Sequence, residues 1–257
     1  MKRLYVSSIE QKCPYKCIYC FNESAEYQKG ISYTQKEDIF NGAKECEIIQ
    51  PACDSELLLS ANWRERLDEL VLFNKNISFA TKKNVTQKEV EYLSKINDRL
   101  KKVGKILNVG VTICRYEHYK EIEHYAPTPE DRIKGLRMMY EAGIGCNVII
   151  RPLFPDCEFS DLKRIIDLTK DFTYGYLLGP LYLNDAVNEY LKMKNLKNVK
   201  IEKKRPDWNQ NNEISVIYSN ELSNKVVNYI HEVGQMAFDS NEDCVKTIES
   251  IVGSKNA

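Results

Sequence analysis

The sequence lacks the features that would direct it into or across a membrane. No apolar run is long enough to span a bilayer, and the opening Met-Lys-Arg-Leu-Tyr-Val is too short to be a signal sequence. It also lacks an excess of charge of one sign, because 37 lysines and arginines balance 37 aspartates and glutamates. The chain therefore has no overall basic field that would steer it onto nucleic acid. We expect a soluble, cytoplasmic protein with no membrane partner.

Several common cofactor motifs are missing as well. There is no P-loop, and Gly143-Ile-Gly145 lacks the third glycine of a dinucleotide-binding turn. The histidines His118, His124 and His231 have no metal-ligand spacing, and no second Cys-x-x-Cys pair could complete a zinc site. Nine cysteines in such a chain are typical of a reducing compartment. One cysteine-rich segment remains as the candidate metal centre.

That segment is Cys13-Pro-Tyr-Lys-Cys17-Ile-Tyr-Cys20, directly after an apolar strand. A [4Fe–4S] cluster normally takes four cysteines, one for each iron. Three cysteines in one loop leave one iron without a protein ligand, and an open metal position can hold a small molecule. The spacing therefore favours a cluster that takes part in chemistry over one that only stores electrons, with zinc as the weaker alternative.

The segment, written Cys-x-x-x-Cys-x-Tyr-Cys, resembles the signature of the radical S-adenosylmethionine (radical SAM) enzymes. The resemblance implies that Cys13, Cys17 and Cys20 hold a [4Fe–4S] cluster, that SAM chelates the open iron, and that Tyr19 lies near the adenine. It implies reductive cleavage of SAM to a 5′-deoxyadenosyl radical, which abstracts hydrogen from a substrate. An electron donor such as flavodoxin or ferredoxin is implied as a partner.

The order of the elements predicts an α/β fold. Short apolar runs at residues 4–7, 47–51, 77–80, 107–113, 146–152 and 174–178 alternate with helical patterns. Such alternation gives parallel strands with right-handed crossovers. We expect a partial (βα)6, TIM-like radical SAM barrel over residues 1–184 and a short α-helical extension over 185–257 that closes or flanks it. Sites in barrels lie at the carboxyl ends of the strands, which is where the cysteine loop falls.

Local patterns also predict helix ends and the elements of the extension. Capping boxes at residues 34–37, 86–89 and 128–131 are expected to open three helices. In the extension, we expect a short strand at 214–218 and helices at 220–238 and 242–252.

Residues 77–155 resemble the spore photoproduct lyase-like (DNA repair photolyase-like) branch of these enzymes. Ile-Ser-Phe-Ala-Thr-Lys at 77–82, Glu-His-Tyr-Ala-Pro-Thr-Pro-Glu-Asp-Arg at 123–132 and Glu-Ala-Gly-Ile-Gly-Cys-Asn-Val-Ile-Ile-Arg-Pro-Leu-Phe-Pro at 141–155 carry this resemblance. It implies a lyase-type radical reaction in which Lys82 reaches the SAM carboxylate and Thr112 or Arg115 approaches the ribose. A nucleic-acid or nucleotide lesion is the implied substrate, with a peptide or small metabolite left open. Glu123 and Arg132 are expected to form or border an ion-pair network.

The segment after the second predicted strand departs from the radical SAM pattern. A Gly-Gly-Glu-like stretch usually receives the methionine amino group, but residues 51–57 read Pro-Ala-Cys-Asp-Ser-Glu-Leu. Asp54 or Glu56 is the candidate acceptor, because an ammonium group requires acceptor oxygens. Cys53 resembles in position the cysteine that returns a hydrogen atom to the product radical in spore photoproduct lyase, although buried thiols are commonly simple core residues. Arg151, at the end of the fifth predicted strand, is a candidate clamp for SAM or for an anionic group of the substrate.

Two readings other than an enzyme remain open. The first is a cluster-bearing binding or redox-sensing module, which would need a fourth cysteine ligand, Cys46 or Cys53. The second is a nucleic-acid-binding module with a structural cluster. It would use the basic run that precedes Trp208, where an aromatic could stack a base, although such runs are more often solvated faces. That run contains Lys192, Lys194, Lys197, Lys200, Lys203, Lys204 and Arg205.

Overall fold

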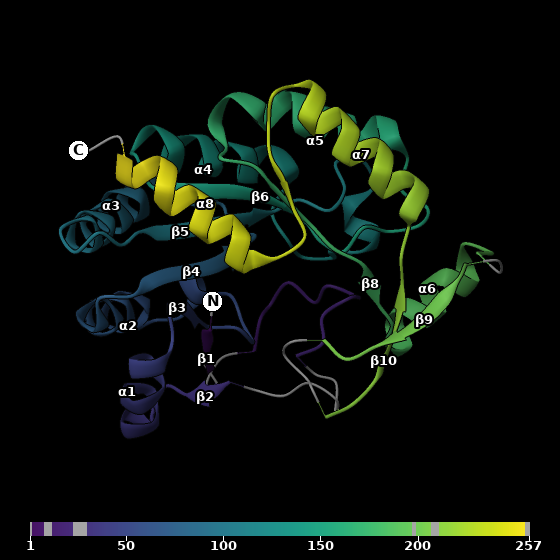
Figure 1. Ribbon diagram of the computed structural model, residues 1–257. Coiled ribbons are helices and arrows are strands. Elements are labelled where there is room, and N and C mark those ends of the chain that lie inside the picture. The colour runs from purple at the N-terminus through teal and green to yellow at the C-terminus, as the bar shows by residue number, and fades with distance from the viewer. Residues whose placement is uncertain (1, 8–11, 23–29, 197–198, 207–210, 255–257) are drawn as a thin grey trace.

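The computed structural model of the protein describes residues 2–7, 12–22, 30–196, 199–206 and 211–254. All six predicted strands are present, as β1 (Arg3–Ser7), β3 (Ile48–Pro51), β4 (Asn76–Thr81), β5 (Leu107–Thr112), β6 (Gly145–Ile150) and β7 (Tyr176–Leu178). Two short strands that were not predicted, β2 (Ile31–Ser32) and β11 (Ala237–Phe238), pair with β1 and β7. The sheet runs β11-β7-β6-β5-β4-β3-β1-β2 with every pair parallel (Figure 1). Since β2 and β11 form its two edges, the described sheet is the predicted open, partial barrel.

Five helices follow the strands and cover the outer face of the sheet (Figure 1): α1 (Lys36–Glu45), α2 (Trp63–Leu70), α3 (Gln87–Lys101), α4 (Pro129–Glu141) and α5 (Phe159–Thr169). Alternate strand residues point to this side, because successive side chains of a strand face opposite ways. Val109 and Val148 are fully buried there, in one core with Leu136 and Met139 of α4. The inner face of the sheet is lined by different types of side chain, and these form the floor of the candidate site.

The capping box predicted at 86–89 is confirmed, and at 128–131 Thr128 caps the helix as predicted but without the reciprocal bond of a full box. The Glu89 carboxylate accepts from the Thr86 backbone N–H at 2.9 Å, and the Thr128 hydroxyl accepts from the Asp131 N–H at 3.1 Å. The prediction at residues 34–37 is wrong, because α1 is capped at Gln35 and not by a side chain. A turn follows β2, in which the Gln35 N–H donates to the Ser32 carbonyl at 2.9 Å, and it moves the helix start past Thr34.

The segment that follows β7 contributes strands as well as helices. Strands β8 (Leu181–Tyr182), β9 (Ile201–Lys204) and β10 (Ile214–Ile217) form a separate antiparallel sheet in the order β8-β10-β9, beside helix α6 (Asp185–Met193). The predicted strand at 214–218 is therefore confirmed. The helix predicted at 220–238 is too long: α7 (Asn220–Glu232) ends before Gly234, whose φ is +76°, and the chain then enters β11.

The last helix, α8 (Asn241–Ser254), matches the helix predicted at 242–252 and closes one end of the inner face. Its Val245 and Ile248 form a small apolar cluster with Ile48 and Ile106, which stand at the amino-terminal ends of β3 and β5. Figure 1 shows α8, in yellow, lying across the sheet. The carboxyl ends of the strands are left as the mouth of the barrel. No helix in the described residues has the length and apolar character of a membrane span.

Candidate active site

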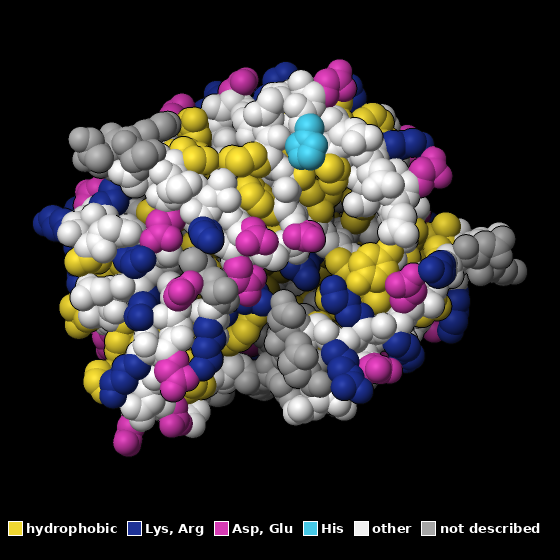
Figure 2. All heavy atoms as spheres, in the orientation of Figure 1, with side chains coloured by type: hydrophobic (Ala, Val, Ile, Leu, Met, Phe, Trp, Pro, Cys, Tyr) yellow, Lys and Arg dark blue, Asp and Glu magenta, His cyan; other side chains and the backbone are white. Residues whose placement is uncertain are grey.

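The inner face of the barrel has an open recess near the mouth. Ala80 is exposed to solvent although it lies within β4, a strand paired on both sides. Its partner in β5 is Gly110, so two small residues stand side by side at this point. Below them the Asn108 amide donates to the Ser78 hydroxyl at 3.2 Å and to Asn147 Oδ1 at 3.1 Å, which makes a buried polar floor. Figure 2 shows the molecule hollowed near the middle of this view, with lysine and arginine side chains at the edge of the hollow.

The cysteine loop begins after β1 and lies against the segment that precedes α4. Cys17 forms an isolated antiparallel bridge with Glu123, and the Ile18 N–H donates to the Ile122 carbonyl at 3.0 Å. The Cys20 N–H donates back to the Cys17 carbonyl at 3.0 Å, which folds the loop into a tight turn. The backbone at Cys17 and Ile18 is thus held by a segment more than 100 residues further along the chain.

The three predicted ligands are thiols in this loop, two of them, Cys17 and Cys20, at the ends of the turn. Cys13 and Cys17 are half-buried and Cys20 is exposed, and none of the nine cysteines, all of which are described, forms a disulfide. Burial raises the pKa of the Cys17 thiol to about 11, although nearby Lys82 acts in the opposite direction. Within the described ranges, no three His, Cys, Asp or Glu side chains surround a single point as they would one metal ion. The thiolates of a cubane bind separate irons, so three free thiols in one loop fit that group without converging on one point.

Tyr19 is anchored beneath the loop by a buried ion pair. Its hydroxyl donates to Glu123, which pairs with Arg132 at 2.5 Å, and both of these side chains are fully buried. Arg132 also donates to the carbonyls of Thr112 at 3.0 Å and Pro127 at 2.9 Å. Burial raises the pKa of Tyr19 well above its ordinary value. The expected Glu123–Arg132 network is therefore confirmed, and it supports the cysteine loop from below.

Lys82 lies next to this loop, at the end of β4. Its ammonium nitrogen is 5.3 Å from the centre of the Tyr19 ring. Burial by itself would lower its pKa, but the nearby Cys17 and Glu123 raise it above the ordinary value. No carboxylate of the described residues forms an ion pair with this ammonium group. Lys82 therefore offers a positive charge, beside the cysteines, that no carboxylate in the described part of the chain neutralises by direct contact.

The residues predicted after β3 lie beside the end of β1. The Cys53 N–H donates to the Val6 carbonyl at 3.2 Å, and the buried Asp54 carboxylate accepts from the Ser7 hydroxyl. Glu56 is buried too, and it accepts from the Thr81 hydroxyl at 2.6 Å and the Lys82 N–H at 2.9 Å. Burial raises the pKa of the Glu56 carboxyl group. The structure thus brings Cys53, Asp54, Glu56 and Lys82 to the same end of the sheet as the cysteine loop.

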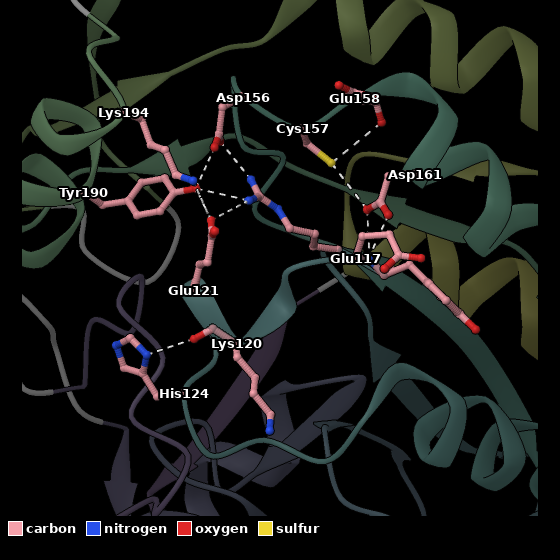
Figure 3. Close-up of polar contacts among 12 residues, drawn as sticks. Glu117, Lys120, Glu121, His124, Asp156, Cys157, Glu158, Asp161, Tyr190 and Lys194 are labelled. Carbon is pink, nitrogen blue, oxygen red and sulfur yellow. Dashed lines mark hydrogen bonds and ion pairs between the residues drawn. The ribbon is translucent and has the colours of Figure 1, made fainter.

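Arg115 occupies a separate polar cluster further along the mouth. Its guanidinium donates to Asp156 at 2.8 Å and to the Tyr190 hydroxyl at 3.1 Å, and it lies 3.5 Å from Glu121. Figure 3 shows Asp156, Tyr190 and Glu121 turned toward one another, with Lys194 close by. Arg115 is only 6% exposed, so this network takes up most of its hydrogen-bonding capacity. Thr112, the other ribose candidate, is buried at the end of β5.

Arg151 extends over the backbone of Gly179, beyond the end of β6. A Cβ atom at Gly179 would lie 2.4 Å from Arg151 Nε and 2.6 Å from its Cδ, so only glycine allows this close approach. The side chain is half-buried, and in the described part of the chain its guanidinium has neither an ion-pair nor a hydrogen-bond partner. Arg151 is thus a second uncompensated positive charge at the mouth.

Comparison with solved structures places this geometry in a known fold. A spore photoproduct lyase variant with bound AdoMet (S-adenosylmethionine) and dinucleoside spore photoproduct superposes with a TM-score of 0.61 at 13% identity, covering 92% of this chain and 81% of that one. Streptococcus suis SuiB bound to S-adenosylmethionine superposes with a TM-score of 0.59 at 13% identity, covering 93% of this chain and 49% of SuiB. The chain has the spore photoproduct lyase-like radical SAM fold. The fold expected from residues 77–155 is confirmed.

Sequence comparison finds two relatives, both named as uncharacterised proteins. The uncharacterised protein MJ0683 of Methanocaldococcus jannaschii is 32% identical over 102 residues, which is 39% of this chain and 36% of that protein. The uncharacterised protein ORF301 of Acidianus two-tailed virus is 26% identical over 225 residues, 74% of this chain and 71% of that one. No protein-family model matches the chain.

The radical SAM fold also brings residues to the site that the sequence did not single out. Asn184, at the start of α6, donates from its side-chain amide to the carbonyls of Ile18 at 2.9 Å and Cys20 at 3.3 Å. Phe154 packs edge-on against Tyr19, with ring centres 5.8 Å apart. Asparagine before a helix is a capping signal, but no local pattern reports a contact across more than 160 residues.

Two further expectations involve residues away from the recess. Cys46, a candidate fourth ligand, is buried at the end of α1, before β3, and so lies at the opposite end of that strand from Cys53. In the predicted basic run, Lys197 and Trp208 lie outside the described residues. Four of the remaining six basic residues pair with glutamates, in the pairs Lys192–Glu189, Lys194–Glu121, Lys200–Glu202 and Arg205–Glu213.

Proposed function

We propose that this chain is a radical SAM enzyme in which Cys13, Cys17 and Cys20 hold a [4Fe–4S] cluster and SAM completes its open iron. The carrying observation is the position of the three free thiols, in one loop at the mouth of an open parallel barrel and beside the ammonium group of Lys82, which has no ion-pair partner among the described residues. When bound, the cluster, reduced by a donor such as flavodoxin or ferredoxin, would supply the electron that cleaves SAM to methionine and a hydrogen-abstracting 5′-deoxyadenosyl radical.

The protein would hold SAM through its methionine and ribose groups. Lys82 suits the carboxylate, because its ammonium group has no acidic ion-pair partner in the described chain. Asp54 and Glu56, which replace the usual glycine-rich segment, are the candidate neighbours of the amino group. Of the two ribose candidates, Thr112 is the better one, because Asp156 and Tyr190 already occupy Arg115. Tyr19 would present its ring to SAM and not its hydroxyl, because the hydroxyl donates to the Glu123 carboxylate.

The second uncompensated cation indicates an anionic substrate. SAM carries one carboxylate, which Lys82 would bind, and Arg151 then remains for a phosphate or carboxylate of the substrate. A nucleotide or nucleic acid is the proposed class, in keeping with the dinucleoside spore photoproduct bound by the lyase of similar fold. Cys53, half-buried at the end of β3, is the proposed donor that returns a hydrogen atom to the product radical.

Anaerobic reconstitution tests this proposal. Protein loaded with iron and sulfide, reduced with dithionite and mixed with SAM should release 5′-deoxyadenosine, measured by chromatography. Cys17→Ala should lose both the cluster absorption and the product, whereas Cys46→Ala, a matched change at a cysteine far from the loop, should keep both. A fully loaded cluster that leaves SAM uncleaved would refute the enzyme assignment.

A further inference from the structure

Helix α6, the first element of the carboxyl-terminal extension, contacts the cysteine loop through the side chain of the residue that caps it, Asn184. The Asn184 Nδ2 donates to the Ile18 carbonyl at 2.9 Å and to the Cys20 carbonyl at 3.3 Å. Its Oδ1 accepts from the Val187 N–H at 2.8 Å and so caps α6. One amide group therefore joins the start of a helix to the backbone between two of the three cysteines.

This double role requires the chemistry of an amide. An amide side chain has a carbonyl that accepts and an NH2 group with two donors, whereas a carboxylate only accepts. Aspartate is as good a helix cap as asparagine. At this position it would still accept from Val187 but would present a negative oxygen to the two loop carbonyls. The cap and the loop contact can thus be separated by a single substitution.

Aromatic contacts support the same connection on both sides of Cys20. Phe21, the residue after it, packs edge-on against Tyr182 of β8, with ring centres 5.8 Å apart. On the other side, Tyr19 meets Phe154, whose ring also packs edge-on against Tyr190 of α6 at 5.7 Å. Asn184 lies between Tyr182 and Tyr190 in the sequence, so one short stretch of the chain contacts this segment at three of its residues and reaches Tyr19 through Phe154.

We propose that Asn184 is a positioning residue for the cluster loop, through which α6 fixes the backbone from Cys17 to Cys20 before any cluster binds. The extension then does more than flank the barrel, because it sets the geometry of two of the three proposed ligands. The link to a cluster rests on the proposed function, but the ordering of the loop does not. The proposal can therefore be measured on protein without iron.

Hydrogen–deuterium exchange of the metal-free protein, kept reduced, is the test. The Ile18 amide donates to the Ile122 carbonyl and the Cys20 amide donates to the Cys17 carbonyl, so the exchange of both reports opening of the loop. Asn184→Asp should speed both by about tenfold, because two hydrogen bonds to the loop are lost. The Val187 amide should stay protected. Asn184→Ser, an uncharged residue that also caps helices, should keep the Val187 protection and speed the loop amides as well.

A matched control separates loop positioning from general loss of a helix cap. The Ser240 hydroxyl accepts from the Asp243 N–H at 3.1 Å and caps α8, far from the loop. Ser240→Ala should therefore leave the exchange of Ile18 and Cys20 unchanged. In reconstituted protein, Asn184→Asp should release iron to a chelator faster than the parent. Unchanged loop exchange in both Asn184 variants would overturn the proposal, whereas a parent protein that fails to cleave SAM would refute only the proposed function.

Discussion

Removing Arg132 should destabilise the protein strongly, because it would strand a buried carboxylate beneath the cysteine loop. Arg132 and Glu123 are both 0% exposed, and Arg132 also donates to two backbone carbonyls. Breaking a buried ion pair from one side costs about 3–5 kcal/mol. Arg132→Met should thus remove a large part of a total stability of about 5–15 kcal/mol. In a domain of this size it should lower the melting temperature by about 6–20 °C.

A second variant shows whether the stranded charge is the cause. Glu123→Gln keeps an oxygen that can accept from the Tyr19 hydroxyl but removes the negative charge. The double variant should therefore recover about 2 kcal/mol relative to Arg132→Met alone. Thermal and urea unfolding of the reduced, metal-free proteins, followed by circular dichroism, measures both effects.

Lys225→Met supplies a matched control for this experiment. The Lys225–Glu221 pair lies on the surface of α7, with side chains 57% and 86% exposed, so its loss should leave the melting temperature unchanged. The reasoning is refuted if Arg132→Met unfolds within about 1 kcal/mol of the parent. It is also refuted if adding Glu123→Gln makes the protein less stable still.

Three further substitutions test individual parts of the site. Lys82→Met should leave the cluster absorption intact but raise the SAM concentration for half-maximal cleavage by about tenfold to a hundredfold, because a charge-assisted contact is lost. Gly179→Ala should displace the Arg151 side chain, since the new Cβ would lie 2.4 Å from its Nε, and should weaken binding of an anionic substrate in a titration while SAM cleavage persists. Cys53→Ala should still yield 5′-deoxyadenosine but change the products formed from the substrate; loss of the cluster absorption would instead show that Cys53 is a ligand.

Features that depend only on residues close together in the chain could be predicted from the sequence by itself. The spacing of Cys13, Cys17 and Cys20 predicts a loop with three thiols, and the caps at Thr86 and Thr128 depend on residues only three positions away. The six main strands could be predicted because parallel strands buried on both faces appear as continuous apolar runs. Their order along the sheet then follows from short right-handed crossovers.

Contacts between distant segments were decided by the tertiary structure alone. Asn184 meets Ile18 and Cys20 across 166 and 164 residues, and Arg115 meets Tyr190 across 75. The two-residue strand β11 forms only because β7 offers an open edge. No local pattern encodes such pairings, because they arise when whole elements pack and their side chains meet. The cysteine spacing thus determined the loop of three thiols in which we propose a cluster, and packing of the distant elements decided which side chains surround that loop.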